Sequence, residues 1–246
     1  MDVTTQPEAQ EPERPQRDGP SGGYSSASTW ESRYEEQEGT FDWYATYKEL
    51  RCVFQEFCPP APDLDVLMLG CGNSAFSAEL YEAGYQQIVN IDIAEAAIKK
   101  MQEKFADLAM QWRVMDATAM SLEDASFDLA VDKGTLDAMM HGGTSGQGLA
   151  MDMTAEVWRI LRPGGLFLLI SHSGKRQPIL DNAVLDKHGP SAQWELLELR
   201  KCALCPQAML INILRSKLDG RPLMEGFKDH KMLKEAADEA RYTLKQ

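Results

Sequence analysis

Two glycines and one aspartate stand at a spacing that suits a nucleotide-like ligand. Residues 66–75 read VLMLGCGNSA, so Gly70 and Gly72 follow a short apolar run and precede a helical pattern. Gly70 permits a tight turn, and Gly72 lets the backbone approach a ligand closely. Asp92 stands twenty residues after Gly72, at the end of the next apolar run. A carboxylate there can accept hydrogen bonds from both ribose hydroxyls, at roughly 1.5–3 kcal/mol each.

This pattern leaves the ligand open, because short Gly-x-Gly runs also occur as plain turns and Ala75 suits a dinucleotide site. Three features favour S-adenosyl-L-methionine. Asp116 ends the third predicted strand and can accept the adenine amino group, with the Ala117 backbone beside it. A predicted terminal hairpin is typical of methyltransferases, by fold-level analogy. Aromatic faces attract a sulfonium cation, and three aromatic residues precede the first strand: Trp30, Tyr34 and Trp43. The alternative is that these rings only pack an N-terminal flap.

A second group of candidate residues follows the fourth predicted strand, in the run Asp132-Lys133-Gly134-Thr135. Methyl transfer from a sulfonium is an in-line displacement, in which the protein aligns the nucleophile and supplies electrostatics. Asp132 is the candidate catalytic residue, which would position an acceptor amine; a helix cap is its alternative. Asp137 is a weaker candidate that we expect to face solvent. We expect Lys133 to line the cofactor pocket, with an exposed loop lysine as the alternative.

A lysine amine as acceptor would first have to lose its proton. With an unperturbed pKa of about 10.4, reaching the neutral form at pH 7 costs roughly 4–5 kcal/mol. A nearby sulfonium and desolvation both lower that pKa, so the sequence demands no strong dedicated base. The four histidines show no metal-ligand spacing, and we predict no metal site. His172 follows the fifth predicted strand and could touch a substrate, although an ordinary loop histidine is the more common case.

Apolar runs alternate with helical patterns along the middle of the chain, which predicts an α/β, Rossmann-like fold with a parallel sheet. Predicted strands cover 66–69, 88–91, 111–114, 127–131 and 166–171, and predicted helices cover roughly 44–57, 75–83, 94–105 and 151–161. Strand-like runs at 194–202 and 209–216 have no helix between them, which predicts an antiparallel hairpin turning at 205–207. Residues 141–148 are expected to form a glycine-rich loop, and 172–193 match no recognisable element.

Composition divides the chain into three parts. Residues 1–27 are rich in Pro, Gln, Glu, Gly and Ser, and we predict a disordered tail because they bury too little apolar surface to offset chain entropy. Residues 28–220 form the expected α/β domain. Residues 221–246 form a C-terminal extension with a charged helix at 231–244.

The net charge of −13 favours a basic protein partner and argues against nucleic acid, whose phosphates require a basic surface. The chain has five cysteines, and because this number is odd we do not predict a disulfide framework. No apolar run reaches the roughly 18 residues of a membrane span, and no N-terminal targeting pattern is visible. We therefore expect no membrane partner and a cytoplasmic location.

Six motifs, taken in order, make the chain similar to a known family. They are FDWY at 41–44, LGCGNS at 69–74, NIDI at 90–93, MDAT at 115–118, SFDLAVDKGTLDA at 126–138 and LRPGG at 161–165. They resemble the methyltransferase-like family that modifies lysines of translation elongation factor 1-alpha, in particular the N-terminal domain of its dual lysine and N-terminal methyltransferase. The resemblance covers roughly residues 28–216. DKGTLDA with GCGNS is specific, whereas LRPGG is shared by many methyltransferases.

The resemblance implies a seven-stranded class I methyltransferase sheet, S-adenosyl-L-methionine as cofactor, and a protein lysine, such as one of elongation factor 1-alpha, as acceptor. By motif position it implies contacts with the cofactor at these residues: Trp30, Tyr34, Trp43, Gly70, Asp92, Ile93, Asp116, Ala117 and Lys133. The glycine spacing described above adds Gly72 to this set. The alternatives are a small-molecule methyltransferase on the same fold and a non-catalytic cofactor-binding module. A nicotinamide dehydrogenase is a more remote one.

Overall fold

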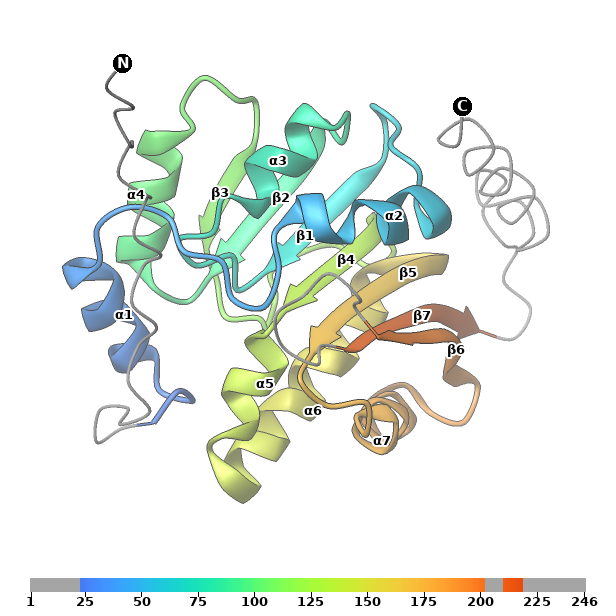
Figure 1. The fold of residues 1–246 in the computed structure, drawn as a ribbon. Coiled ribbons are helices and arrows are strands. Elements are labelled where there is room, and N and C mark those ends of the chain that lie inside the picture. The colour runs from blue at the N-terminus through green and yellow to red at the C-terminus, as the bar shows by residue number, and fades with distance from the viewer. Residues whose placement is uncertain (1–22, 202–209, 219–246) are drawn as a thin grey trace, which may run out of the picture.

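A twisted seven-stranded sheet forms the centre of the protein in a computed structural model that describes residues 23–201 and 210–218 (Figure 1). Its order is β3-β2-β1-β4-β5-β7-β6. The strands are β1 (Asp65–Leu69), β2 (Gln87–Asp92), β3 (Gln111–Val114), β4 (Phe127–Lys133), β5 (Leu161–Ser171), β6 (Ala192–Lys201) and β7 (Leu210–Leu218). Strand β7 runs antiparallel to both of its neighbours, and the other four pairings are parallel. The predicted α/β sheet with an antiparallel hairpin is confirmed.

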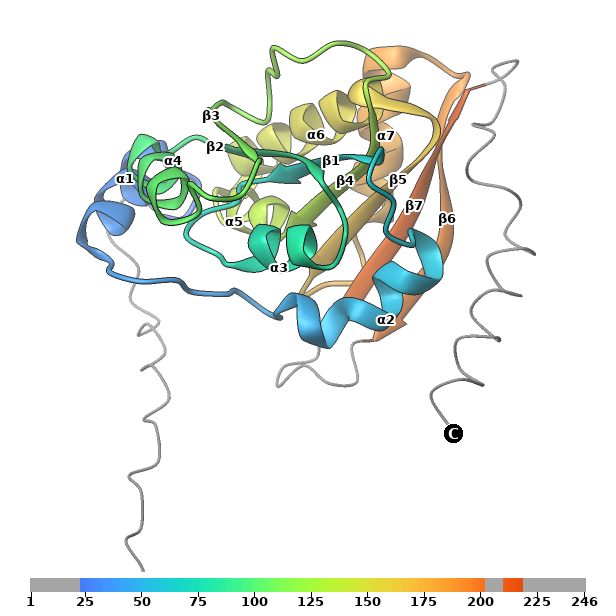
Figure 2. The ribbon, with the colours of Figure 1, turned by 90° about the horizontal axis from the view of Figure 1, so that it is seen from above.

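Helices cover both faces of this sheet (Figure 2). One face carries α2 (Tyr47–Phe57), α3 (Phe76–Glu82) and α4 (Glu95–Lys104), and the other carries α5 (Thr135–Met140), α6 (Gly143–Ile160) and α7 (Gln177–His188). Helix α1 (Ala27–Glu36) packs outside α4, where Tyr34 contacts Ala94 and Ala97. None of the helices in the described ranges is long and apolar enough to cross a membrane.

Strand β1 is buried on both faces, which explains why residues 66–69 are apolar without a break. In β1, Val66 and Met68 enter the core beneath α2 and α3, whereas Leu67 and Leu69 enter the core beneath α6. Successive side chains of a strand point to opposite faces. A continuous apolar run therefore predicts a strand that is covered by helices on both sides.

The glycine-rich loop predicted at 141–148 is wrong, because most of it is the first part of α6. Gly146 is buried at this point, and a Cβ atom on it would overlap the carbonyl oxygen of Met139. The missing side chain lets α6 pack closely against the end of α5. Glycine lowers helix propensity by about 1 kcal/mol, so here the tertiary contact decides against the local preference.

Two further segments differ from their predicted form. Residues 172–193, which matched no element, contain α7 and the start of β6, and α7 buries Leu180, Ala183 and Val184. Helix α2 begins at Tyr47, three residues later than predicted, where the Thr46 backbone N–H donates to Glu49 Oε2 at 2.7 Å as in a capping box. The predicted hairpin turn, residues 1–22 of the predicted tail and the extension at 221–246 lie outside the described residues.

Candidate functional site

The glycine turn leaves β1 in a backbone conformation that suits glycine alone. Gly70 has φ +55° and Gly72 has φ +52°, a region that costs other residues roughly 1–2 kcal/mol. A Cβ atom on Gly70 would overlap the side chain of Thr135, whose hydroxyl donates to the Leu69 carbonyl at 3.0 Å. A Cβ atom on Gly72 would overlap the hydroxyl of Tyr34. Both glycines are therefore fixed by backbone angle and by space.

Asp92 ends β2 and is joined directly to this turn. Its Oδ2 accepts the Gly72 N–H at 2.8 Å, and its Oδ1 accepts the Ala94 N–H at 2.9 Å. The side chain is buried, and burial raises its pKa to about 6 although these hydrogen bonds oppose the shift. An ionised carboxylate has about four acceptor positions, so it retains capacity for two more donors.

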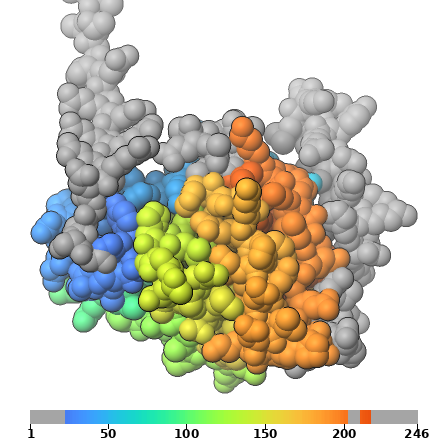
Figure 3. Space-filling view, turned by 90° about the horizontal axis from the view of Figure 1, so that it is seen from below, coloured from blue at the N-terminus to red at the C-terminus, as the bar shows by residue number. Residues whose placement is uncertain are grey.

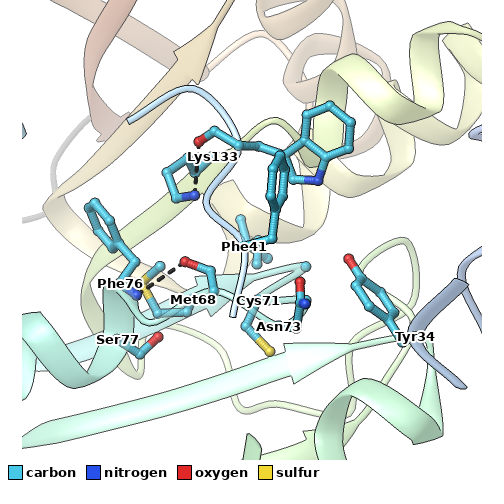
Figure 4. Close-up of a pocket in the computed structure, with 13 residues that line it drawn as sticks. Tyr34, Phe41, Met68, Cys71, Asn73, Phe76, Ser77 and Lys133 are labelled. Carbon is cyan, nitrogen blue, oxygen red and sulfur yellow. Dashed lines mark hydrogen bonds between the residues drawn. The ribbon is translucent and has the colours of Figure 1, made fainter. Parts of the chain in front are cut away.

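A pocket lies over the turn and is lined by thirteen residues (Figure 4). Figure 4 shows Tyr34 and Phe76 at opposite ends, with Cys71 and Asn73 between them. Of the predicted site residues, five line this pocket: Tyr34, Trp43, Gly70, Gly72 and Lys133. Sequence analysis missed several lining residues, which come from the segment before α2, the end of the glycine turn and the start of α3: Phe41, Asn73, Ser74, Phe76 and Ser77.

Residues 39–46, here called the strap, connect α1 to α2 and close one side of the pocket. The Phe41 N–H donates to the Asn73 carbonyl at 3.1 Å. The ammonium of Lys133 forms an ion pair with Asp42 at 3.0 Å and donates to the Trp43 carbonyl at 3.0 Å. Burial lowers the pKa of Lys133, and the charge of Asp42 opposes that shift. Lys133 therefore lines the pocket with its stem and ties the strap to β4 with its ammonium.

The three predicted aromatic residues lie together beside the pocket. The rings of Trp30 and Tyr34 are stacked at 5.6 Å between centroids, and Trp43 stands edge-on to Trp30 at 6.5 Å. The guanidinium of Arg33 lies 5.2 Å from the centroid of Trp43. Packing of an N-terminal helix is thus one role of these rings, since they hold α1 against the strap.

Three other predicted cofactor contacts, Ile93, Asp116 and Ala117, lie farther along the same edge of the sheet and do not line this pocket. Ile93 follows Asp92 and is 42% exposed. Asp116 is exposed, and its Oδ1 accepts both the backbone N–H and the hydroxyl of Thr118 at 2.8 Å. Ala117 is buried beside it. The carboxyl ends of β2 and β3 therefore carry these side chains next to Asp92.

Asp132 is fully buried near the end of β4. Its two oxygens accept the backbone N–H groups of Thr135, at 2.7 Å, and Leu136, at 2.9 Å. Burial raises its pKa to about 7, and the nearby charge of Asp137 adds to that shift. The carboxylate holds the first turn of α5, which is the capping arrangement considered from the sequence.

The prediction that Asp137 faces solvent is wrong, because the residue is 1% exposed. Its carboxylate accepts the hydroxyl of Tyr44 at 2.9 Å, the hydroxyl of Ser171 at 2.7 Å, the Arg176 guanidinium at 2.6 Å and the His172 N–H at 2.9 Å. Burial opposes ionisation, but these hydrogen bonds and charges outweigh it and leave the pKa of Asp137 below its usual value. The DKGTLDA motif was the one sequence signal for this residue.

Comparison with known proteins gives a domain family and several curated relatives. Residues 67–169 match the family described as methyltransferase domain. The eEF1A lysine and N-terminal methyltransferase of Bos taurus is 43% identical over 152 residues, which is 60% of this chain and 22% of the relative. EEF1A lysine methyltransferase 4 of Mus musculus is 32% identical over 162 residues, which is 61% of this chain and 62% of the relative. The match thus spans about a fifth of the longer relative's length.

Among solved structures, the N-methyltransferase NodS of Bradyrhizobium japonicum, in complex with S-adenosyl-L-homocysteine, is similar with a TM-score of 0.52. It is 16% identical, and the match covers 68% of this chain and 85% of NodS. At this identity the likeness shows the fold alone. The shared fold agrees with the strand order and the antiparallel β7 described above.

Proposed function

We propose that this protein methylates a lysine side chain of another protein. The premise is that residues 67–169 are a methyltransferase domain on the class I S-adenosylmethionine-dependent fold. The observation that carries the proposal is the direct contact between Asp92 and the Gly72 turn at the carboxyl edge of the sheet. The curated relatives named for lysine methylation support the acceptor class. We keep residues 28–220 as the extent of the catalytic domain.

The described residues fit S-adenosyl-L-methionine, the cofactor that such a domain implies. Asp92 retains acceptor positions for ribose hydroxyls, and Gly70 and Gly72 themselves add no side chain to the pocket at the turn. Asp116, Ala117 and Ile93 would hold the adenine. When bound, the cofactor supplies a methyl group activated by a sulfonium. The aromatic residues and the lysine at the pocket would enclose that end: Trp30, Tyr34, Trp43 and Lys133.

The acceptor side of the site lies where β4 and β5 end. We keep Asp132 as the residue that positions the acceptor, acting through the first turn of α5, which its carboxylate holds. The net charge of −13 favours a basic protein as the partner. Elongation factor 1-alpha is the proposed substrate because relatives are named for it. A cytoplasmic location, where that factor would be met, belongs to the same proposal.

The proposal is tested by incubating the full chain with heavy-methyl cofactor and either a cell lysate or purified elongation factor 1-alpha. Mass spectrometry should find the label on lysine of a protein. The matched control is Asp92→Ala, which should weaken cofactor binding more than tenfold, since each charge-assisted hydrogen bond contributes roughly 1.5–3 kcal/mol. Label confined to metabolites would instead indicate a small-molecule methyltransferase. Cofactor binding without any transfer would indicate a non-catalytic module.

A further inference from the structure

We propose that His172, oriented by Asp137, accepts the proton that the acceptor lysine must lose before methyl transfer. This inference rests on the proposed function and names the group that would carry out its proton transfer. His172 follows the last residue of β5, at the carboxyl edge of the sheet that holds the glycine turn and Asp92. Its role is not assigned by any of the motifs that indicate the cofactor.

The geometry fixes which ring nitrogen of His172 can act. Nδ1 lies 2.7 Å from Oδ2 of Asp137, and the backbone N–H of His172 donates to the same oxygen at 2.9 Å. An ionised carboxylate only accepts, so Nδ1 carries the hydrogen and Nε2 keeps its lone pair. The side chain of His172 is 51% exposed, whereas that of Asp137 is 1% exposed. A buried carboxylate that orients an accessible imidazole is the arrangement of a general base.

The His172–Asp137 pair does not itself line the pocket but is connected to its lining through Tyr44 and Gly134. Tyr44 of the strap donates its hydroxyl to Asp137 at 2.9 Å. Its ring lies over Gly134, where a Cβ atom would come within 3.0 Å of it. Gly134 directly follows Lys133, which lines the pocket. Figure 3 shows α5 and α6 at the surface of this face, between α1 and the segment that includes α7, so a protein substrate can approach it.

Several titratable groups face His172 from the elements packed around it. They are Asp137 from α5, Tyr44 from the strap, His141 at the end of α5 with ring centroids 6.5 Å apart, and Arg176 before α7, which shares Asp137 at 2.6 Å. Arg176 is a permanent cation, and His141 contacts the backbone carbonyl oxygen of Asp137 at 2.7 Å rather than its carboxylate. Asp137 is committed to its five hydrogen bonds, and burial raises the pKa of the Tyr44 hydroxyl.

The other candidates at the end of β4 are also unsuitable. Asp132 is 0% exposed and its oxygens point to the backbone of α5, so it offers no accessible atom to an acceptor amine. Lys133 is a cation paired with Asp42. Histidine is the side-chain type whose charge ordinarily changes between pH 5 and 8. His172 therefore combines access, orientation and suitable chemistry at this edge.

The proton balance of the step is complete. An N–H bond of the lysine ammonium breaks, and the proton moves to Nε2 of His172. The freed nitrogen lone pair then forms the new N–C bond to the methyl carbon, while the S–C bond breaks and its electron pair stays on sulfur. His172 passes the proton to water before the next turnover. The lowered pKa of an amine near a sulfonium makes this transfer easier but still requires an acceptor.

The test compares His172→Gln with the wild-type full chain on the lysine substrate. General-base catalysis contributes roughly 10²–10⁴-fold, and we expect the low end, about a 100-fold fall in kcat at pH 7.5, with the KM for cofactor unchanged. The deficit should shrink as the pH rises toward about 10.4, where the amine loses its proton to solvent. The matched control is His188→Gln, since His188 lies on α7 and contacts the Ala155 carbonyl instead.

Asp137→Asn provides a second measurement of orientation. Because the carboxylate fixes which nitrogen of His172 carries the hydrogen, its loss should lower kcat in the same direction as His172→Gln, with the KM for cofactor unchanged. A merely structural role would reduce stability and would give no such separation of kcat from KM.

The outcomes separate this inference from the proposed function. A wild-type chain that methylates no protein lysine contradicts the proposed function. A wild-type chain that does so, with His172→Gln equal to it or reduced by one factor at every pH, overturns only the role of His172.

Discussion

Replacing Gly72 by Ala would test whether Tyr34 closes over the glycine turn. The new Cβ would overlap the Tyr34 hydroxyl oxygen and lie 3.1 Å from its Cζ, at a φ of +52°. The backbone angle alone costs about 1–2 kcal/mol. Tyr34 is 5% exposed and packs on Ala94 and Ala97, so it cannot move without disturbing α1. Overpacking of this kind costs about 1–3 kcal/mol. We therefore expect Gly72→Ala to lower the free energy of unfolding by about 2–5 kcal/mol.

Two matched variants separate the parts of this loss. Tyr34→Phe removes the overlapping oxygen, so Gly72→Ala in that background should lose about 1–2 kcal/mol less, a coupling within the range of contacting residues. Gly39→Ala has φ +76° and nothing within 4 Å of the new Cβ, so it should show only the backbone strain. The assay is urea unfolding of all variants, with calorimetry of cofactor binding.

The reasoning would be refuted by equal losses for Gly72→Ala with and without the Tyr34 hydroxyl. Equal losses for Gly72→Ala and Gly39→Ala would refute it too, since the two sites share only the positive φ. In either case Tyr34 would not lie against the turn in solution. The stacking of Trp30, Tyr34 and Trp43 would then give no support for their proposed contact with the cofactor.

Three other predictions concern ionised groups. Burial raises the pKa of Asp92 to about 6. Because ribose hydroxyls require the ionised carboxylate, the Kd of the cofactor measured by calorimetry should rise about tenfold per pH unit below pH 6. A Kd that does not change with pH would contradict the ribose assignment. Lys133→Met should lower the free energy of unfolding by about 2–4 kcal/mol, since Asp42 loses its partner, whereas adding Asp42→Asn should recover part of it in urea unfolding. Asp137→Asn should lower the free energy of unfolding in urea by about 3–5 kcal/mol, because the buried guanidinium of Arg176 loses its charged partner. A decrease below about 1 kcal/mol would mean that water reaches this ion pair.

The glycine turn and Asp92 were predictable because their signals are local. A strand, a turn and a helix within about thirty residues place Gly70, Gly72 and Asp92 at one edge of a parallel sheet, and the structure joins Gly72 to Asp92 at 2.8 Å. The hairpin of β6 and β7 was predictable because two apolar runs lacked a helix between them. The start of α2 was predicted three residues too early, although Thr46 and Glu49 stand at capping-box spacing.

The surroundings of Asp137 were decided by tertiary structure alone. Asp137 accepts from Tyr44, 93 residues away, from Ser171, 34 residues away, and from Arg176, 39 residues away. No periodicity in the sequence encodes such contacts, since each partner lies on a different element. The sequence by itself determined the sheet, the turn and the place of Asp92 beside it, because short-range hydrophobic patterns and backbone angles set them. Only the packing of the strap, α5 and α7 against the strand ends decided that Asp137 is buried and that it holds the ring of His172.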